Sequence, residues 1–424
     1  DIILKTSLFM AKSLGSGEKK SLPGRRNSYI ATISIAVSVV VMIVAVSVSD
    51  GFSKEIGEKV SGFTGDISIR VPGEELTNST YPLQINDSVL TEIEGIKGVN
   101  AVQGIAWITG VIKFNDQIEG VMLKGVDSSY DWSFVQRHFV KENMVDSLFV
   151  PDLNLLLPGS AVISKRLASQ LGINVGDRPF FHFIGESVKT RRFTVSAIFD
   201  ARLENLDKGL VICNIGNVRD LLGWDEESYS SVEVLLDRGA GKRVREKKGE
   251  EIESVLERGR DSDFRDFELV TPNELFPHLF DWLGLLDFNV FIVLALMMAV
   301  AGFNMVSGLL IILFEKISMI GLLKSLGMRD SSIHRIFLYR ALTIVIRGIA
   351  AGNIIAISIL IIQERYGLIS LNPENYFVTQ VPVHLNFVKI LILDLVAIVT
   401  IAAILYIPAR FISKIEPDKS LRQK

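Results

Sequence analysis

The sequence predicts a membrane protein with four transmembrane α-helices and one large extracytoplasmic domain of mixed α/β structure. Hydrophobic residues make up 48% of the 424 residues, and the mean hydropathy is +0.35. That mean is too high for an ordinary soluble protein and too low for a chain that lies wholly in lipid. Four long apolar runs carry the excess, and basic residues alternate between the segments that join them.

Each apolar run is long enough to cross a bilayer. The hydrocarbon core is about 30 Å thick and a helix rises about 1.5 Å per residue, so a span needs roughly 20 apolar residues. The runs are residues 29–49, 288–314, 341–362 and 387–407. The second run exceeds this length, and we expect it to tilt or to project from the membrane as a stalk.

Basic residues in the short connections predict the orientation. Six Lys or Arg residues lie in residues 1–28, five in 315–340 and five in 408–424, whereas 363–386 holds only Arg365. Because cytoplasmic loops carry the excess of Lys and Arg, both termini are expected in the cytoplasm of a bacterial inner-membrane protein. The predicted segments are a cytoplasmic elbow (1–28), the first span (29–49), a periplasmic domain (50–287), the second span (288–314), a cytoplasmic coupling segment (315–340), the third span (341–362), a short periplasmic loop (363–386), the fourth span (387–407) and a cytoplasmic tail (408–424).

The first run has an alternative interpretation as a cleaved signal peptide, because residues 45–47 resemble a small-residue cleavage site. The run is longer than the 7–15 apolar residues typical of a signal peptide. We therefore expect an uncleaved anchor.

The outer domain shows both strand and helix patterns. Alternating residues at 66–70 predict a half-buried strand, and residues 106–123 predict a hairpin that turns near 114–117. Strands are also predicted at 192–199 and 209–214. Helices are predicted at 164–172, where a glycine ends the helix, and at 244–258.

No catalytic motif is present. The histidines of the outer domain are widely spaced and form no metal-binding pattern. Residues 15–21 only faintly resemble a phosphate-binding loop, because Lys19 stands where that motif needs glycine. The single cysteine, Cys213, lies in an apolar run and is expected to be a buried hydrophobe. The net charge of −3 gives no indication of a nucleic-acid partner. The chain is therefore not expected to be an enzyme or to bind a cofactor.

The segments that follow the second and fourth spans carry the most specific motifs. Residues 315–328 (EKISMIGLLKSLGM) and 408–422 (PARFISKIEPDKSLR) resemble the FtsX-like permease family. In that family a charged pair, Ile-Gly, Leu-Lys and Leu-Gly follow the second span. Met319 departs from the family, which often has an acidic residue there.

Within this family the chain most resembles the lipoprotein-releasing (Lol-type) permeases. Residues 46–52 (VSVSDGF) are similar to their Ser-Val-x-Asn-Gly-Phe, with Asp50 in place of asparagine. Residues 371–383 (LNPENYFVTQVPV) are similar to their Asp-Pro…Tyr…Pro-Val signature. The resemblance is weak only from residue 72 to 154.

The resemblance implies a porter-like α/β domain with an inserted strand-rich unit above four membrane helices. It also implies partners: two copies of a cytoplasmic ABC ATPase that binds ATP and Mg, a second permease chain (identical or homologous), a lipoprotein cargo and a periplasmic carrier. A hairpin hook grips the carrier in these relatives. The matching turn is short here and comprises Ile184, Gly185, Glu186, Ser187 and Val188.

Three further sets of candidate residues follow. Apolar residues that recur every three positions after the second span predict a short amphipathic helix. Because no other apolar partner for it is evident in the sequence, we expect this helix to dock on the ATPase. The alternative is that the helix lies on the lipid surface. The coupling residues are Glu315, Lys316, Ile317, Ile320, Gly321, Leu323, Lys324, Leu326 and Gly327.

By the resemblance, a cargo cavity lies between the outer halves of the first two spans. Its candidate residues are Val40, Ile43, Val44, Val48, Phe288, Phe291 and Ile292, and a charged collar of Asp50, Lys54, Glu55 and Asp287 lies just outside it.

Three of the polar residues inside the predicted spans are candidates for a functional contact, namely Asn304, Arg347 and Asp394. Charged residues inside a membrane are costly and usually face the helix bundle or water. Arg347 is expected to extend toward the inner interface. Asp394 is expected to make a structural or switching contact with Asn304 or a partner chain.

The resemblance leaves three functions open. The first is extraction of lipoproteins from the inner membrane for transfer to a periplasmic carrier. The second is a mechanotransmitting permease that controls an extracytoplasmic partner, such as a cell-wall hydrolase, without transport. The third, tripartite efflux, is disfavoured because those relatives carry their ATPase in the same chain.

Overall fold

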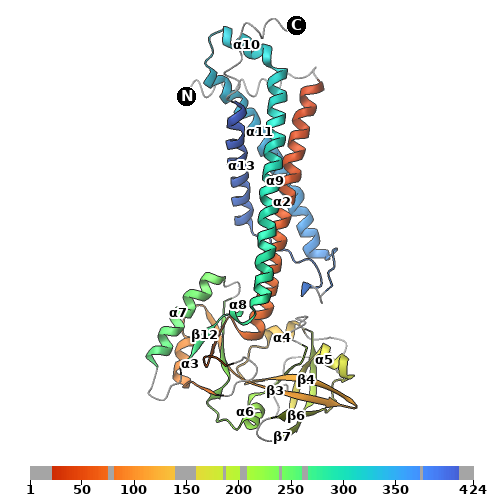
Figure 1. Ribbon diagram of the computed structural model, residues 1–424, viewed down its shortest axis with the longest axis vertical. Coiled ribbons are helices and arrows are strands. Elements are labelled where there is room, and N and C mark those ends of the chain that lie inside the picture. The colour runs from red at the N-terminus through yellow and green to blue at the C-terminus, as the bar shows by residue number, and fades with distance from the viewer. Residues whose placement is uncertain are drawn as a thin grey trace. The chain divides into compact units, whose positions relative to one another are not determined.

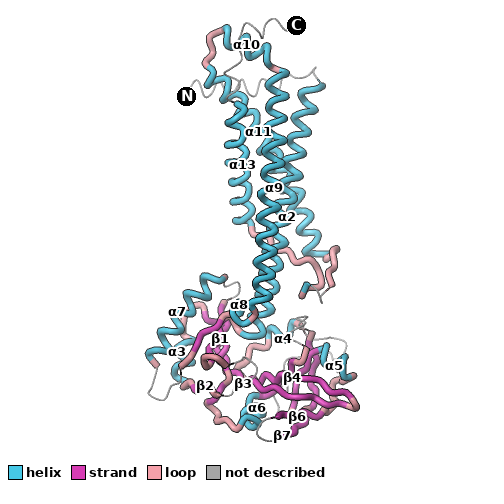
Figure 2. The backbone as a smooth tube through the Cα atoms, viewed as in Figure 1, coloured by secondary structure: helices cyan, strands magenta, loops and turns pink. Residues whose placement is uncertain are grey.

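A computed structural model describes residues 22–74, 81–138, 159–184, 188–200, 208–237, 241–259, 266–372 and 376–409. The chain divides into two compact units. A helical membrane unit contains residues 1–53, 282–370 and 380–424, and an outer domain contains residues 54–281 and 371–379. Figure 2 shows that the long helices belong to the first unit and that the strands gather in the second.

Four helices of the described chain are long and apolar enough to cross a membrane. Each contains one of the predicted runs (Figure 1). They are α2 (Leu22–Thr64), α9 (Pro277–Glu315), α11 (Asp330–Tyr366) and α13 (Phe387–Ala409), and the short helix α10 (Ile317–Ser325) joins α9 to α11.

Helix α2 continues well beyond the predicted first span. The sequence analysis ends that span at the charged Asp50, whereas the helix reaches Thr64. The reason is an apolar stripe at helical spacing, since Phe52, Ile56, Val60 and Phe63 are all buried. Hence α2, like α9, extends past its most apolar part.

Helix α11 approaches α2 through two glycines one turn apart. A Cβ atom at Gly348 would lie 2.8 Å from Cβ of Ile35, and one at Gly352 would lie 2.8 Å from the carbonyl oxygen of Ala36. Real side chains do not approach so closely, so both positions require glycine. A pair of small residues at this spacing lets two membrane helices pack at backbone distance.

The outer domain is built on a ten-stranded mixed sheet in the order β12-β1-β11-β3-β4-β9-β5-β8, with β6 paired to β3 and β7 to β6. The strands are β1 (Ile67–Arg70), β3 (Val99–Phe114), β4 (Gln117–Val126), β5 (Ser160–Ser164), β6 (Phe180–Ile184), β7 (Val188–Arg192), β8 (Thr194–Phe199), β9 (Leu210–Asn214), β11 (Ser231–Leu236) and β12 (Glu268–Val270). A separate pair comprises β2 (Leu83–Gln84) and β10 (Ser228–Tyr229).

Strand β3 connects the two halves of this sheet. Its first half, up to Ile105, pairs with β11, and its second half, from Ala106, pairs with β4. The hairpin of β3 and β4 confirms the one predicted at 106–123. The predicted strands at 66–70, 192–199 and 209–214 correspond to β1, β8 and β9.

Among the described residues of the outer domain, six helices accompany the sheet. They are α3 (Asp87–Glu94), α4 (Ser133–Arg137), α5 (Lys165–Leu171), α6 (Ile215–Leu222), α7 (Lys242–Arg258) and α8 (Pro272–Leu275). The predicted helices at 164–172 and 244–258 are confirmed as α5 and α7, and α5 ends at the left-handed Gly172 as expected. Cys213 is buried in the sheet core, and burial raises the pKa of its thiol to about 12, which fits a buried hydrophobe.

Candidate coupling and cargo surfaces

The predicted coupling segment forms a compact turn between α9 and α11. Helix α9 ends at Glu315, Lys316 precedes α10, and Gly327 adopts the left-handed conformation that lets the chain reverse into α11. Lys324 forms an ion pair with Asp330 at 3.0 Å, which links α10 to the first turn of α11. The segment is therefore a fixed part of the membrane unit.

The predicted apolar residues of this segment differ from one another in exposure. Ile320 is fully buried against the core of the bundle, Leu323 packs on that core, and Gly321 is also buried. The premise that the predicted stripe lacks an apolar partner is thus wrong for Ile320, because that side chain belongs to the buried apolar cluster of the membrane unit. Leu326, one of the predicted residues, is 76% exposed, and Leu322, which was not predicted, is 53% exposed. Ile317 is half-buried.

The candidate cargo residues of the two helices differ in exposure. Ile43 is fully buried in the bundle core, Val40 and Val44 pack against that core, and Val48 is half-buried. The three residues of α9 remain exposed: Phe288 is 59%, Phe291 65% and Ile292 47% exposed. They belong to a longer apolar face of α9 that also includes Leu285, Leu296, Val300 and Phe303.

Three of the four predicted collar charges have partners within the chain. Asp50 accepts from Lys389 of α13 at 2.6 Å, and Asp287 accepts from the Ser49 hydroxyl at 2.6 Å. Glu55 lies 3.6 Å from Lys59. The first two contacts connect α2 with α13 and with α9, so Asp50 and Asp287 hold helices together in this conformation.

The two motifs that carry the closest family resemblance pack against each other. The amide of His384 donates to the carbonyl of Ser47 at 3.0 Å. A Cβ atom at Gly51 would lie 2.4 Å from the carbonyl oxygen of Pro382, so only glycine fits there. The segment before α13 is thereby fastened to α2. The sequence analysis recognised both motifs but not their contact.

The candidate carrier hairpin is formed by β6 and β7. Ile184 and Val188, which pair at its end, are 76% and 68% exposed. Gly185, Glu186 and Ser187 lie outside the described residues. The hairpin continues the sheet through the pairing of β6 with β3.

The intramembrane polar residues have different surroundings. Asn304 of α9 donates to the hydroxyl of Ser34 on α2, and Arg347 is exposed on α11. Asp394 accepts from Asn353 of α11 at 2.8 Å. Asn353 is a partner that the sequence analysis missed, and the predicted contact of Asp394 with Asn304 is not among the contacts of the described residues.

The bond between Asp394 and Asn353 is expected to stabilise the pairing of α13 with α11. A double-mutant cycle with Asp394→Leu, Asn353→Leu and the double variant should give a coupling energy of about 0.6–1.7 kcal/mol, the range for polar pairs between membrane helices. The measurement is reversible unfolding in detergent. A coupling energy near zero would show that the bond contributes nothing to the pairing.

Two family comparisons account for most of the chain. Residues 28–247, just over half of it, match the MacB-like periplasmic core domain. Residues 291–417 match the C-terminal part of the FtsX-like permeases. The chain belongs to the FtsX-like permeases with a MacB-like periplasmic core. It is a multi-pass membrane protein with a periplasmic domain, and such permeases are non-catalytic subunits that work with a partner ATPase.

Curated relatives extend this similarity over nearly the whole permease. It is 23% identical to "Lipoprotein-releasing system transmembrane protein LolC" of Xylella fastidiosa (strain 9a5c), covering 98% of this chain and 100% of that protein. It is 23% identical to the LolC protein of Neisseria meningitidis serogroup B, covering 94% and 96%. It is 22% identical to the corresponding LolE protein of Haemophilus influenzae, covering 99% of each.

Solved structures resemble the periplasmic part of the permease. The periplasmic region of MacB from Actinobacillus actinomycetemcomitans is 13% identical, with a TM-score of 0.35, and covers 52% of this chain and 96% of that one. The extracellular domain of YknZ, a noncanonic ABC-type transporter from Gram-positive bacteria, is 15% identical, with a TM-score of 0.33, and covers 48% and 99%.

Proposed function

We propose that this permease extracts lipoproteins from the outer leaflet of the bacterial inner membrane and passes them to a periplasmic carrier. A separate cytoplasmic ATPase, present in two copies and carrying ATP and Mg, drives the cycle, and a second permease chain completes the membrane part. Both termini lie in the cytoplasm. The family supports the ATPase partner, and the full-length similarity to relatives named as lipoprotein-releasing proteins supports the choice of cargo.

The observation that carries this proposal is the exposed apolar face of α9. Acyl chains need an apolar surface throughout their path, because each methylene group moved from lipid to water costs about 0.8 kcal/mol. The face offers two phenylalanines in its outer half, Phe288 and Phe291, and continues to Phe303, which is 74% exposed. We therefore propose α9 as the cargo surface rather than α2, whose candidate residues are buried or half-buried.

Release from proteoliposomes tests the function. The complex with its ATPase is reconstituted with a triacylated protein and supplied with an acceptor that binds acyl chains. Cargo should appear in the soluble fraction only with ATP, and a catalytically inactive ATPase is the control. An active ATPase without release would instead favour the mechanotransmitting permease.

Helix α10 is proposed as the contact for the ATPase. Leu322 in this helix and Leu326, which directly follows it, are exposed in the part of the chain that the structure describes. Replacing both with Asp should lower co-purification of the ATPase at least about tenfold, because each central apolar contact of an interface contributes 1 kcal/mol or more.

A matched control separates docking from the effect of an added charge. Leu368 is 71% exposed and follows α11 at its other end. Leu368→Asp should leave the yield of ATPase unchanged. If the Leu322→Asp/Leu326→Asp variant co-purified as much ATPase as the wild-type permease, α10 would not be the docking site.

A further inference from the structure

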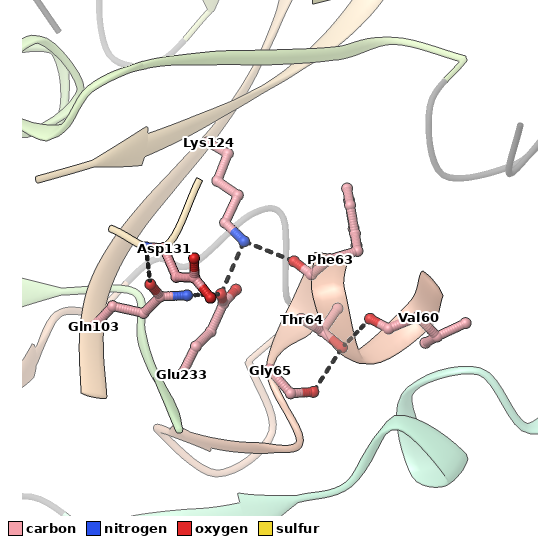
Figure 3. Close-up of polar contacts among 8 residues, drawn as sticks. All are labelled: Val60, Phe63, Thr64, Gly65, Gln103, Lys124, Asp131 and Glu233. Atoms are coloured by element: carbon pink, nitrogen blue, oxygen red, sulfur yellow. Dashed lines mark hydrogen bonds and ion pairs between the residues drawn. The ribbon is translucent and has the colours of Figure 1, made fainter. Parts of the chain in front are cut away.

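Helix α2 ends in the periplasmic domain at a buried lysine. The carbonyl of Phe63 is among the last four of the helix, which have no partner within it. Lys124 of β4 donates from Nζ to this carbonyl at 2.6 Å (Figure 3). Gly65 then turns the chain into β1, with a positive φ of 76°. A cation at this end also complements the helix dipole.

The same ammonium group reaches across the sheet to Glu233. Lys124 lies opposite Trp107 of β3, and Glu233 of β11 lies opposite Gln103 on the other side of β3. The Nζ–Oε2 distance is 2.8 Å, and Gln103 also donates to this oxygen, at 3.3 Å (Figure 3). The pair therefore joins the two halves of the sheet that meet on β3.

Both charges are removed from water. Lys124 is 1% and Glu233 0% exposed. Three aromatic rings surround the ammonium group, with centroids 5.2 to 5.6 Å away, and they belong to Tyr130, Trp107 and Phe63. Rings at this distance stabilise a cation. The arrangement fixes the position of Nζ from several sides.

Stability alone does not explain a buried ion pair here. Well-packed apolar residues of similar volume usually make a fold as stable or more stable. A pair of apolar side chains, however, has no donor for a hydrogen bond to a helix carbonyl group. Two other contacts fasten the same end of α2: Arg245 of α7 donates to Asp66 at 3.0 Å and to Ser61 at 3.1 Å. The contacts at this end therefore favour a fixed attachment of α2.

We propose that Lys124 is a positioning residue that fixes the end of α2 to both halves of the sheet, so that any movement of α2 also moves the sheet. Because α2 is one continuous helix from the membrane unit into the periplasmic domain, the attachment would transmit the ATP-driven movement of its membrane part. Its role in cargo release rests on the proposed function, whereas the attachment itself does not.

A distance measurement tests the attachment independently of cargo. Spin labels are placed at the exposed positions Glu58 of α2 and Lys113 of β3, in the full complex with its ATPase. The native Cys213 is buried and should not react. The distance distribution should be narrow and equal with and without ATP. Lys124→Met/Glu233→Leu should broaden it or make it depend on nucleotide, and an unchanged distribution would overturn the proposal.

A release assay tests the consequence. The same double variant should keep its thermal stability, its ATPase partner and its rate of ATP hydrolysis, but release at least tenfold less cargo per ATP. The control is Arg258→Met/Glu92→Leu, which removes an exposed ion pair of the same domain and should behave as wild type. Unchanged release by the first variant would refute the coupling.

Absence of release by the wild-type complex would refute the proposed function and leave the distance result valid. If the apolar double variant does not fold, Lys124→Gln/Glu233→Gln is measured in its place.

Discussion

Replacing Gly352 with leucine is expected to force α11 away from α2 and to remove most of the folded permease from detergent extracts. Even a Cβ atom there would lie 2.8 Å from the Ala36 carbonyl oxygen and 2.8 Å from Cβ of Val39. Gly352→Ala already overpacks this contact and should cost about 1–3 kcal/mol of stability. Size-exclusion yield and the thermal midpoint after detergent extraction measure the effect.

The neighbouring Ala350 provides the control for this prediction. It is exposed on the same helix, so Ala350→Leu introduces the same side chain without meeting α2. This variant should be recovered at the wild-type yield. If Gly352→Leu were recovered equally well, the close approach of α11 to α2 would be wrong.

Removing Glu233 alone should destabilise the periplasmic domain strongly. Glu233→Leu leaves the ammonium of Lys124 buried without its counter-ion, which costs about 3–5 kcal/mol for a broken buried pair. For a domain of this size the thermal midpoint should fall by roughly 10 °C. Replacing both partners, as in Lys124→Met/Glu233→Leu, should restore most of the loss because no uncompensated charge remains.

The pH dependence of Glu233→Leu has a definite sign. Burial lowers the pKa of Lys124, and Glu233 opposes that shift, so the pKa should fall further in the variant. Between this lowered pKa and the ordinary lysine value of about 10.4, the unfolded chain binds the proton and the folded chain does not. Stability should therefore rise with pH across that window. The double variant, which lacks Lys124, should not show this rise.

The sequence predicts the membrane helices well because their signal is local. Each apolar run lies within a helix of the structure, and the β3–β4 hairpin was recognised from its turn. The continuation of α2 to Thr64 was missed because the polar residues after Asp50 interrupt the hydropathy. The buried stripe from Phe52 to Phe63 shows that helical periodicity was the better signal there.

The sites were predicted less well because they depend on tertiary contacts. A stripe of apolar residues every three positions identified α10 as amphipathic, but could not reveal that Ile320 is buried in the bundle core while Leu322 is exposed. The contacts of Asp394 with Asn353 and of Lys124 with Glu233 join residues far apart in the chain. A lone charge within an otherwise apolar helix or strand was the local signal for Asp394, Lys124 and Glu233, since such residues are seldom buried unless paired.

Nucleotide-dependent cross-linking at Phe291 tests the assignment of the cargo surface to α9 most directly. A photo-reactive residue at this position, in proteoliposomes that contain the ATPase and an acylated protein, should capture the acylated protein without ATP and lose it when ATP is added. Ile354, 69% exposed on α11 against 65% for Phe291, serves as the control and should capture only phospholipid. Capture of phospholipid alone at Phe291, or capture of cargo that does not change with ATP, would contradict extraction along α9.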